Sequence, residues 1–351
     1  MTFNNNKIGL VFSGGGGKGA YEIGVWRALQ EFNLCHQISA IAGASVGALN
    51  AALFAQGDLA LAEKLWQNME QGDVLYSAPI SMLEKIGRLI IAMPGGTPAM
   101  AVSVVRMLRS KGTFSRAGLL SLMEKNIDAS KVASLGLPVF ATCRKKGSLK
   151  IRHFSLANAD PSRLFSILLA SSAIPFIFPP ETIDGEQWFD GGIPSIKGSN
   201  TPIQAVYDAG CRFIIAVLLD MDDLVDVTQF PDAKILFVYP QESNGGFFSG
   251  ALDFEGIHAD RRMEQGYEDT MRILEPIFRM GVAQIRYEKI LEIALQQAKE
   301  FAQLTRNLEE AKIESSDAKA EAIRAIAELH ENCSLTDQEF SNAKKRIIER
   351  L

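Results

Sequence analysis

The sequence predicts an α/β fold in which a largely parallel sheet is covered by helices on both faces. Three observations support this prediction: short apolar runs alternate with helical patterns, several of these runs end in glycine, and a strand-turn-helix unit occurs twice near the start. The chain has 351 residues, of which 47% are hydrophobic and 22% are charged. This is the balance of a globular protein with a sizeable core, and the length favours a tail or second module beside one large domain.

Each predicted strand is a short run rich in β-branched or other apolar residues. The six runs cover residues 7–12, 38–42, 137–142, 150–154, 213–218 and 234–238. Helices are predicted after the first two runs, at residues 20–32 and 48–55, because apolar residues recur there at helical spacing or alanine is abundant. Strands that alternate with helices in this way favour parallel pairing, since each connection must cross back over the sheet.

The pattern changes from about residue 256, where strand signals vanish and apolar residues recur at helical spacing between Glu and Lys. Residues 315–317 indicate a break and a new helix start, and Thr336 with Glu339 has capping-box spacing before a last basic helix. We therefore expect one domain over residues 1–275 and a helical C-terminal extension over residues 276–351. The extension is either a solvated helical pair that adds only stability, or a surface for homo-oligomerisation or for a regulatory partner.

Charge and cysteine content exclude several classes of protein. A formal net charge of −5 argues against a broad nucleic-acid-binding surface. The four cysteines are scattered and show neither CxxC spacing nor the density of a disulfide-stapled domain, so a reducing, cytoplasmic location is expected. No secretory signal is visible at residues 1–7, and the uncharged stretches 89–105 and 164–180 are too short and too interrupted by proline to be predicted as membrane spans.

Gly43-x-Ser45-x-Gly47 stands where an apolar strand meets an alanine-rich helix. This is the context of a nucleophile elbow, in which a serine at a sharp turn adopts strained backbone angles that small neighbours permit. The alternative is a glycine-rich turn whose serine caps the helix. A lone motif of this kind favours the alternative, so the choice depends on the other motifs.

A glycine-rich loop, Ser13-Gly14-Gly15-Gly16-Gly17-Lys18-Gly19, follows the first predicted strand. Its backbone N–H groups and the positive end of the next helix suit an anion, either a phosphate or an oxyanion. The loop fails the Walker pattern, because Phe12 takes the first glycine position and Gly19 replaces the Ser or Thr that binds magnesium. Gly14-x-Gly16-x-x-Gly19 matches a dinucleotide fingerprint, but the second strand lacks the acidic residue that would hold a ribose.

A third motif, Trp188-Phe189-Asp190-Gly191-Gly192, follows the run LASSAIPFIFPP at residues 169–180. Taken alone, its aspartate is a turn residue. The SGGGGKG loop, GASVG, ASSAIPFIFPP and DGG occur in this order, however, and together they closely resemble the patatin-like phospholipase family. The resemblance extends to about residue 269 and so covers roughly three quarters of the chain.

The resemblance implies a three-layer α/β/α hydrolase of lipid carboxylic esters, of the phospholipase A or lysophospholipase type, that needs no metal or other cofactor. It implies that Ser45 is the nucleophile and Asp190 its base, with Gly43, Gly47, Gly191 and Gly192 forming the elbow and the DGG motif. The oxyanion hole is assigned to Gly14, Gly15, Gly16, Gly17, Lys18 and Gly19, with the N–H groups of Gly15, Gly16 and Gly17 as donors. One departure is Ser13, where plant members often have Asp, but that position lies outside the dyad.

Two other interpretations stay open: a broader esterase or thioesterase acting on soluble acyl substrates, and a nucleotide-binding module that uses residues 14–19. A conventional triad is not expected, because only His258 and His330 follow Asp190 in the chain and neither follows an apolar strand.

Residues 80–116 are locally basic and apolar, with six cations and one acidic residue. This composition predicts a lid or a membrane-facing segment that settles on anionic lipid, although an ordinary pair of core helices is the alternative. We therefore expect a phospholipid or other acyl-lipid substrate, transient contact with the inner membrane surface, and no nucleic-acid partner.

Overall fold

The computed structural model describes residues 7–70, 116–175, 178–192, 200–220, 225–246, 250–251, 253–310 and 316–349, together with isolated positions between 75 and 114. The chain divides into two compact units, Met1–Ile273 and Leu274–Leu351. The assignment of residues 1–275 to a hydrolase domain and of 276–351 to an extension stays a prediction about what each part does.

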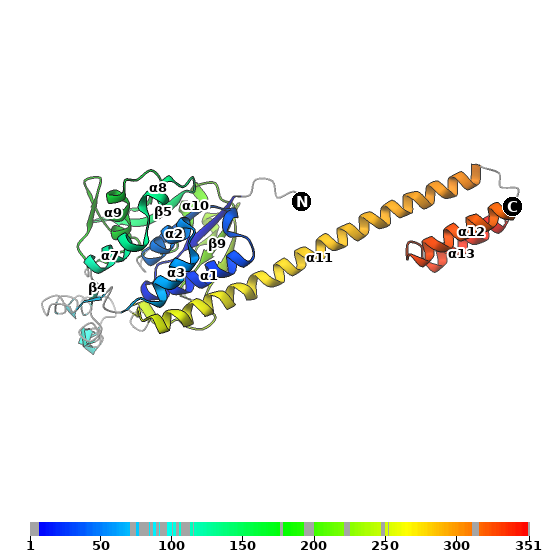
Figure 1. Cartoon of the computed structure of the whole chain (residues 1–351). Helices are drawn as coiled ribbons and strands as arrows, with labels where there is room; N and C mark the ends of the chain where they lie inside the picture. The colour runs from blue at the N-terminus through cyan, green and yellow to red at the C-terminus, as the bar shows by residue number, and fades with distance from the viewer. Residues whose placement is uncertain are drawn as a thin grey trace. The chain divides into compact units, whose positions relative to one another are not determined.

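The first unit is built on an eight-stranded sheet whose main path runs β10-β9-β1-β2-β5-β8-β7. Figure 1 labels β5 and β9 of this sheet among the helices that cover it. The parallel strands of the sheet are β1 (Ile8–Phe12), β2 (Ile38–Ala44), β5 (Val139–Lys145), β9 (Phe213–Val217) and β10 (Lys234–Val238). Three antiparallel strands complete it: β6 (Ile151–Ser155), β7 (Glu181–Ile183) and β8 (Glu186–Asp190). A separate pair joins β3 (Leu75–Tyr76) to β4 (Thr113–Phe114). The predicted fold class, a mainly parallel sheet flanked by helices, is confirmed.

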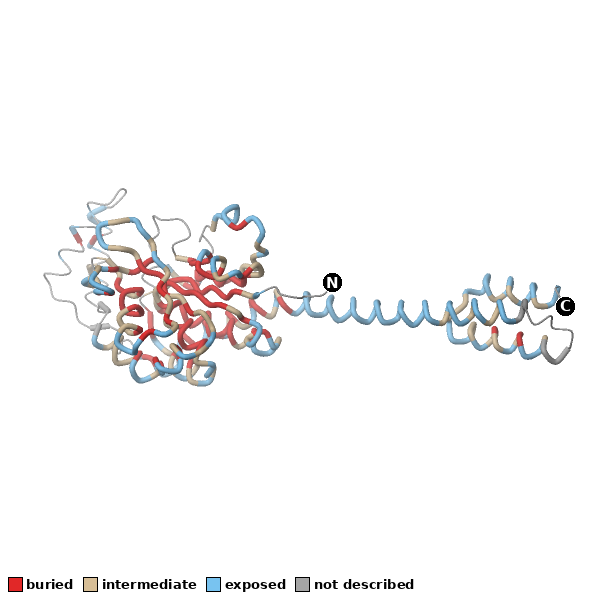
Figure 2. The backbone as a smooth tube through the Cα atoms, turned by 90° about the horizontal axis from the view of Figure 1, so that it is seen from above, coloured by how far each residue is buried: buried red, intermediate tan, exposed pale blue. Residues whose placement is uncertain are grey.

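Helices cover both faces of this sheet. Neighbouring residues of a strand point to opposite faces, so the apolar residues of one buried strand pack against helices on both sides. Val11 of β1 packs in one apolar cluster with α10 (Ile203–Asp208). Phe12, the next residue, points the other way and meets Phe54 of α2 (Val46–Gln56), with ring centroids 6.2 Å apart. Figure 2 shows the buried residues gathered in the strands and in the helices against them.

The α2 side of the sheet also carries further helices within the described residues of the first unit. They are α1 (Ala20–Glu31), α3 (Leu59–Gln67), α7 (Arg116–Asn126), α8 (Ala129–Ser134) and α9 (Pro161–Ser171), and α9 packs on β5, β7 and β8. The long helix α11 (Gly256–Glu310) starts in this unit and lies close against α1. A Cβ at Gly24 would stand 1.8 Å from the carbonyl oxygen of Met263, so glycine permits this crossing.

The second unit consists of α11 from Leu274 onward, α12 (Ser316–Glu331) and α13 (Asp337–Glu349). The predicted capping box is present at the start of α13: the Thr336 N–H donates to Glu339 at 2.9 Å, and the Glu339 N–H donates to the Thr336 hydroxyl at 3.3 Å. Ala322 and Ile326 of α12 are buried, whereas Ile285 and Ile290 of α11 are exposed.

All six predicted strands are present, and the predicted helices at 20–32 and 48–55 correspond to α1 and α2. The hairpin of β7 and β8 was not predicted, because its strands are only three and five residues long and its sequence is polar in part. Within the described residues, no helix is long and apolar enough to span a bilayer. Most of segment 80–116 lies outside the described residues.

Candidate active site

Ser45 occupies a strained turn between β2 and α2, with φ 52° and ψ −126°. A side chain rarely adopts this conformation, which costs on the order of 1–3 kcal/mol and persists only where the surroundings enforce it. The flanking glycines allow the close packing that does so. A Cβ on Gly43 would lie 2.1 Å from the Gly47 carbonyl oxygen, and one on Gly47 would lie 2.5 Å from that of Phe12. The geometry is that of a nucleophile elbow.

Ser171, the last residue of α9, links the backbone of the elbow to β5 through two hydrogen bonds. The Ser45 N–H donates to the Ser171 hydroxyl oxygen at 3.1 Å, and that hydroxyl donates to the Thr142 carbonyl at 2.9 Å. Ser171 is completely buried. These two bonds tie the backbone of the strained residue to β5, and because the helix N-cap position makes no side-chain cap bond, the Ser45 hydroxyl is available for chemistry.

Asp190 ends β8 and is 4% exposed. Its carboxylate accepts a hydrogen bond at 2.8 Å from the Gly192 N–H, and the Ser45 side chain interacts with it and favours its ionised form. Burial raises the pKa of Asp190 from 3.8 to about 7, while these two interactions oppose the shift. A carboxylate with a pKa near neutrality is poised to take up a proton and release it again.

The strand register explains why these residues meet although they are far apart in sequence. β6 lies along one edge of β5, so β2 and β8 must share the other edge. Ala44, the last residue of β2, pairs with Thr142, and Asp190, the last residue of β8, pairs with Cys143. The two strands run in opposite directions and end on consecutive positions of β5. Ser45 therefore emerges from its strand beside Asp190.

The glycine loop lies against the elbow, between β1 and α1. A Cβ on Gly14 would stand 3.2 Å from the Cβ of Ser45. Asn200 holds this end of the loop from both sides: its carbonyl accepts the Gly14 N–H at 3.1 Å, and its side-chain amide donates to the Gly14 carbonyl at 3.0 Å. The Lys18 N–H donates to the Gly15 carbonyl at 3.2 Å. The N–H groups of Gly14 and Lys18 are thus engaged within the protein, which leaves Gly15, Gly16 and Gly17 as the candidate oxyanion donors.

The Lys18 side chain anchors the loop. It is buried, and its ammonium lies 2.5 Å from a carboxylate oxygen of Asp220, which follows β9. A buried cation must be paired to be tolerated, so this ion pair ties the loop to the neighbouring strand. The resemblance assigns Lys18 to the oxyanion hole. In the structure, the ammonium group of Lys18 forms an ion pair with Asp220.

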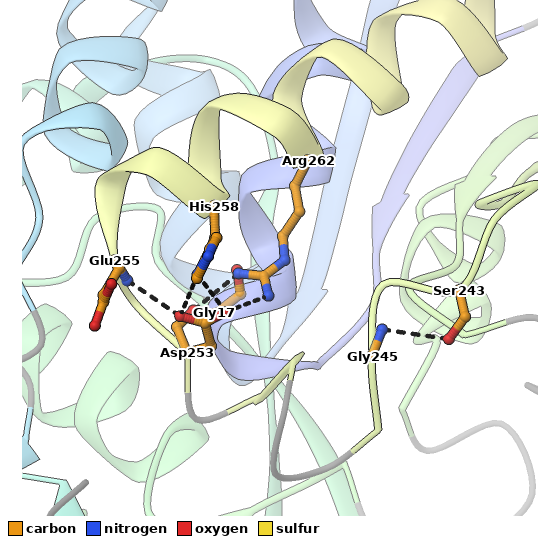
Figure 3. Close-up of polar contacts among 7 residues, drawn as sticks. All are labelled: Gly17, Ser243, Gly245, Asp253, Glu255, His258 and Arg262. Atoms are coloured by element: carbon orange, nitrogen blue, oxygen red, sulfur yellow. Dashed lines mark hydrogen bonds and ion pairs between the residues drawn. The ribbon is translucent and has the colours of Figure 1, made fainter.

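A second anchor comes from the start of α11 (Figure 3). Arg262 donates to the Gly17 carbonyl at 3.2 Å and to the Asp253 carbonyl at 2.9 Å, and it forms an ion pair with the Asp253 carboxylate at 2.9 Å. Arg262 and Asp253 are both buried. The loop is therefore held from outside by α11, and its N–H groups are oriented before any substrate binds.

We expect Gly17→Ala to lower ester hydrolysis by about a hundredfold, as the loss of an oxyanion donor does. The added Cβ would stand 1.9 Å from the Asp253 carbonyl oxygen, which is backbone and cannot swing aside. The loop must shift to relieve this clash, and its donors shift with it. Steady-state kinetics on a soluble ester measures the loss. Gly136→Ala is the control, because a Cβ there meets nothing within 4 Å.

The histidines lie in other settings. His258 contacts Asp253 at 2.9 Å (Figure 3), His330 contacts Asp337 in the second unit, and His153 bonds to the Thr142 hydroxyl at 2.9 Å. The carboxyl group that interacts with the Ser45 side chain is that of Asp190.

His258→Ala is accordingly expected to keep ester hydrolysis within about tenfold of wild type, a barrier change of no more than about 1.4 kcal/mol. Asp253 retains its bonds to Arg262 in this variant, so the glycine loop stays anchored. Inactivity comparable to that of Ser45→Ala, in a protein with an unchanged circular dichroism spectrum, would instead indicate a histidine triad.

An apolar cavity of about 60 Å³ begins at the residue after Ser45. Most of its lining side chains are aliphatic or aromatic and come from α2, α3 and α7, including Val46, Leu49, Leu53, Trp66, Leu119 and Met123. Asn50 on its wall is already hydrogen-bonded to Glu22 at 2.8 Å and to the Trp66 indole at 3.2 Å. A cavity with this lining accepts a hydrocarbon chain and disfavours a charged group.

Sequence reasoning missed several residues that shape the site: Ser171, Asn200, Asp220, Asp253 and Arg262. Ser171 lies inside the quoted ASSAIPF run and could have been singled out there. The others act through contacts between segments that are far apart in sequence, such as Arg262 with Gly17. No local pattern marks such contacts.

The fold and site define an α/β protein with a nucleophile-elbow serine at the carboxyl edge of a mainly parallel sheet, next to a buried carboxyl group and a glycine-rich loop. The chain belongs to the patatin-like phospholipase family, whose model matches residues 10–207. Membership in this family implies a hydrolase of lipid esters.

Curated relatives are distant and much longer. The chain is 25% identical over 234 residues to mouse patatin-like phospholipase domain-containing protein 7. The alignment covers 65% of this chain and 15% of the relative. It is 27% identical over 216 residues to lysophospholipase NTE1 of Cryptococcus neoformans, covering 60% and 11% respectively. The chain thus spans about a seventh or less of the length of these relatives.

Among solved structures, VipD from Legionella pneumophila aligns with a TM-score of 0.41 at 16% identity, over 77% of this chain and 67% of that one. The type III effector protein ExoU aligns with a TM-score of 0.38 at 15% identity, over 99% and 70%.

Proposed function

We propose that this protein cleaves carboxylic ester bonds of membrane phospholipids, as a phospholipase A or lysophospholipase, through a Ser45–Asp190 dyad. The observation that carries the proposal is that the strained Ser45 and the buried Asp190 come from strands that end on consecutive residues of β5. A serine alone is a weak nucleophile and needs an adjacent base that removes its proton during attack. Asp190 is placed for that role and has a suitable pKa of about 7.

The reaction proceeds in two halves. The Ser45 oxygen attacks the ester carbonyl carbon while Asp190 accepts the hydroxyl proton. The negative charge on the carbonyl oxygen is stabilised by the N–H groups of Gly15, Gly16 and Gly17, and one such donor typically contributes about 3 kcal/mol. Asp190 returns the proton to the departing alcohol or lysophospholipid, which leaves an acyl group on Ser45. Water then attacks the acyl carbon while Asp190 accepts its proton, and Asp190 returns this proton to the Ser45 oxygen as the acyl bond breaks, which releases the free fatty acid and restores the hydroxyl.

The apolar cavity beside the elbow supports a long acyl chain as the substrate group. Val46 directly follows the proposed nucleophile in the chain and also lines the cavity, which supports an acyl chain as the group bound next to the elbow. A broader esterase or thioesterase on soluble acyl substrates is the alternative enzyme. A nucleotide-binding module is less well supported, since the end of β2 carries the elbow serine where a ribose-binding acid would stand.

We place the protein in the cytoplasm, at the inner membrane surface during catalysis. All four cysteines are free thiols, which supports a reducing compartment. The C-terminal helices are the candidate element for an oligomeric or partner-dependent restraint on activity, since uncontrolled hydrolysis would damage the membrane of the cell that makes the enzyme.

Mass spectrometry of products from mixed phospholipid vesicles tests this function, with Ser45→Ala as the matched inactive protein. The proposal requires free fatty acid and lysophospholipid from wild type only, and labelling by a fluorophosphonate probe that Ser45→Ala abolishes. Labelling together with hydrolysis of soluble acyl esters but not of vesicles would favour the broader esterase. Absence of labelling together with thermal protection by a dinucleotide would favour the nucleotide-binding module.

A further inference from the structure

The turn between β5 and β6 carries an unusual concentration of positive charge. Residues 144–152, Arg-Lys-Lys-Gly-Ser-Leu-Lys-Ile-Arg, hold five cations and no acidic residue, in a chain whose net charge is −5. Leu149 lies among them and is 72% exposed, the second most exposed large apolar side chain given for the described residues. We call residues 146–150, together with Arg152, the hairpin tip.

The tip is a built turn with several internal bonds. The Lys145 N–H donates to the Lys150 carbonyl at 3.0 Å, and the Ser148 N–H donates to the Lys145 carbonyl at 3.2 Å. The Ser148 hydroxyl oxygen accepts the Lys150 N–H at 3.0 Å, and Gly147 takes the positive φ of 72° that the turn requires. The turn is therefore closed by its own hydrogen bonds, and Leu149 is exposed within it.

Nearby acids neutralise only part of this charge. Glu186 of the adjacent hairpin pairs with Lys145, and Asp184 pairs with Arg163. Lys146 donates instead to the neutral amide oxygen of Gln187 at 2.7 Å. Arg152 lies over the Phe154 ring at 4.5 Å. Lys146, Lys150 and Arg152 are exposed, so the tip presents a net positive surface around an apolar side chain.

The strand register places the tip on the same edge of the sheet as the candidate active site. Thr142 of β5 lies opposite Ala44, which directly precedes Ser45. β5 continues for three further residues in the same direction, about 10 Å at the rise of a strand, before the tip begins. A flat surface that meets the tip therefore lies on the side of the molecule from which Ser45 is approached.

We propose that the hairpin tip docks this protein on anionic phospholipid bilayers, with Lys146, Lys150 and Arg152 at the headgroup phosphates and Leu149 inserted among the headgroups. The inference deepens the proposed function, on which it rests for the identity of the surface. Cations around one exposed apolar side chain suit an interface that is charged outside and apolar beneath. An acidic polymer would use the cations but would leave Leu149 in water.

Vesicle binding of the full-length Ser45→Ala protein tests the proposal without turnover. The test variant adds Lys146→Gln, Leu149→Ser and Lys150→Gln. The matched control adds Lys7→Gln and Lys234→Gln, which remove the same charge at the opposite, amino edge of the sheet, and Val227→Ser, which removes one half-exposed apolar side chain from the segment between β9 and β10. Cosedimentation is measured with vesicles of phosphatidylcholine alone and of phosphatidylcholine mixed with phosphatidylglycerol.

The expected result is a fall of about thirtyfold or more in binding to the mixed vesicles for the test variant, and little change for the control. Binding should also weaken with salt in the parent protein and less so in the test variant. Equal vesicle binding by the test variant and the control would overturn the proposal. Binding of the parent protein to heparin but not to vesicles would also overturn it.

A second measurement separates the two proposals. The same tip substitutions are made in the protein that keeps Ser45, and its hydrolysis of a soluble ester is measured. Normal ester hydrolysis with unchanged vesicle binding would refute the docking surface while the proposed function stands. Tip-dependent vesicle binding in a protein that hydrolyses no ester would refute the proposed function while the docking surface stands.

Discussion

Ser45→Ala and Asp190→Asn are each expected to lower kcat/KM for a soluble ester by at least about 10⁴-fold, equivalent to about 5.5 kcal/mol of barrier. The first variant removes the nucleophile, and the second replaces the base with an amide that cannot accept the proton. Because the two residues act as a unit, the double variant is expected to be no less active than either single variant. Burst and steady-state kinetics on a chromogenic ester measure all three proteins.

Asp184→Asn is the matched control, since Asp184 lies on the same β7–β8 hairpin but is exposed and pairs with Arg163. It should keep activity close to wild type. If Asp190→Asn kept its activity, Asp190 would not be the base, and another group would have to accept the Ser45 proton.

Ester hydrolysis is also expected to depend on pH through Asp190. The base must be ionised to accept the Ser45 proton, and burial raises the pKa of Asp190 to about 7. Activity should therefore be full above about pH 8 and fall about tenfold per pH unit below about pH 6, a loss on the order of a hundredfold at pH 5. The measurement is a pH profile of kcat/KM, with circular dichroism at each pH to confirm that the protein stays folded. A flat profile down to pH 5 in the folded protein would contradict an Asp190 base with a raised pKa.

The same shift predicts a stability difference. Between its ordinary value of 3.8 and about 7, the folded protein retains a proton on Asp190 that the unfolded chain has lost. The contribution of this group to folding stability therefore falls as pH rises through that window. Asp190→Asn removes the buried charge, so we expect a higher Tm than wild type at pH 8 and a difference that shrinks toward pH 4. Thermal melts at both pH values check this, and a variant less stable than wild type at pH 8 would contradict it.

Local sequence patterns predicted most of the fold because the physics behind them is local. An apolar run such as residues 213–218 predicts a buried strand wherever it falls in the chain, and Gly43-x-Ser45-x-Gly47 predicts a tight turn from steric limits on its own backbone. The β7–β8 hairpin escaped prediction because residues 181–190 mix polar and apolar side chains in short strands. Its position beside β5 comes from pairing with a distant strand.

The sequence by itself determined the alternation of strands and helices, the elbow, the glycine loop and the order of the motifs. Only the tertiary structure decided that β2 and β8 end on neighbouring residues of β5, that Arg262 holds the Gly17 carbonyl, and that Asp190 is desolvated enough to have a pKa of about 7. It also decided that the basic turn between β5 and β6 lies at the edge of the sheet that carries Ser45. These features depend on strand register and burial, which arise from contacts between residues far apart in the chain and leave no periodic signal in the sequence.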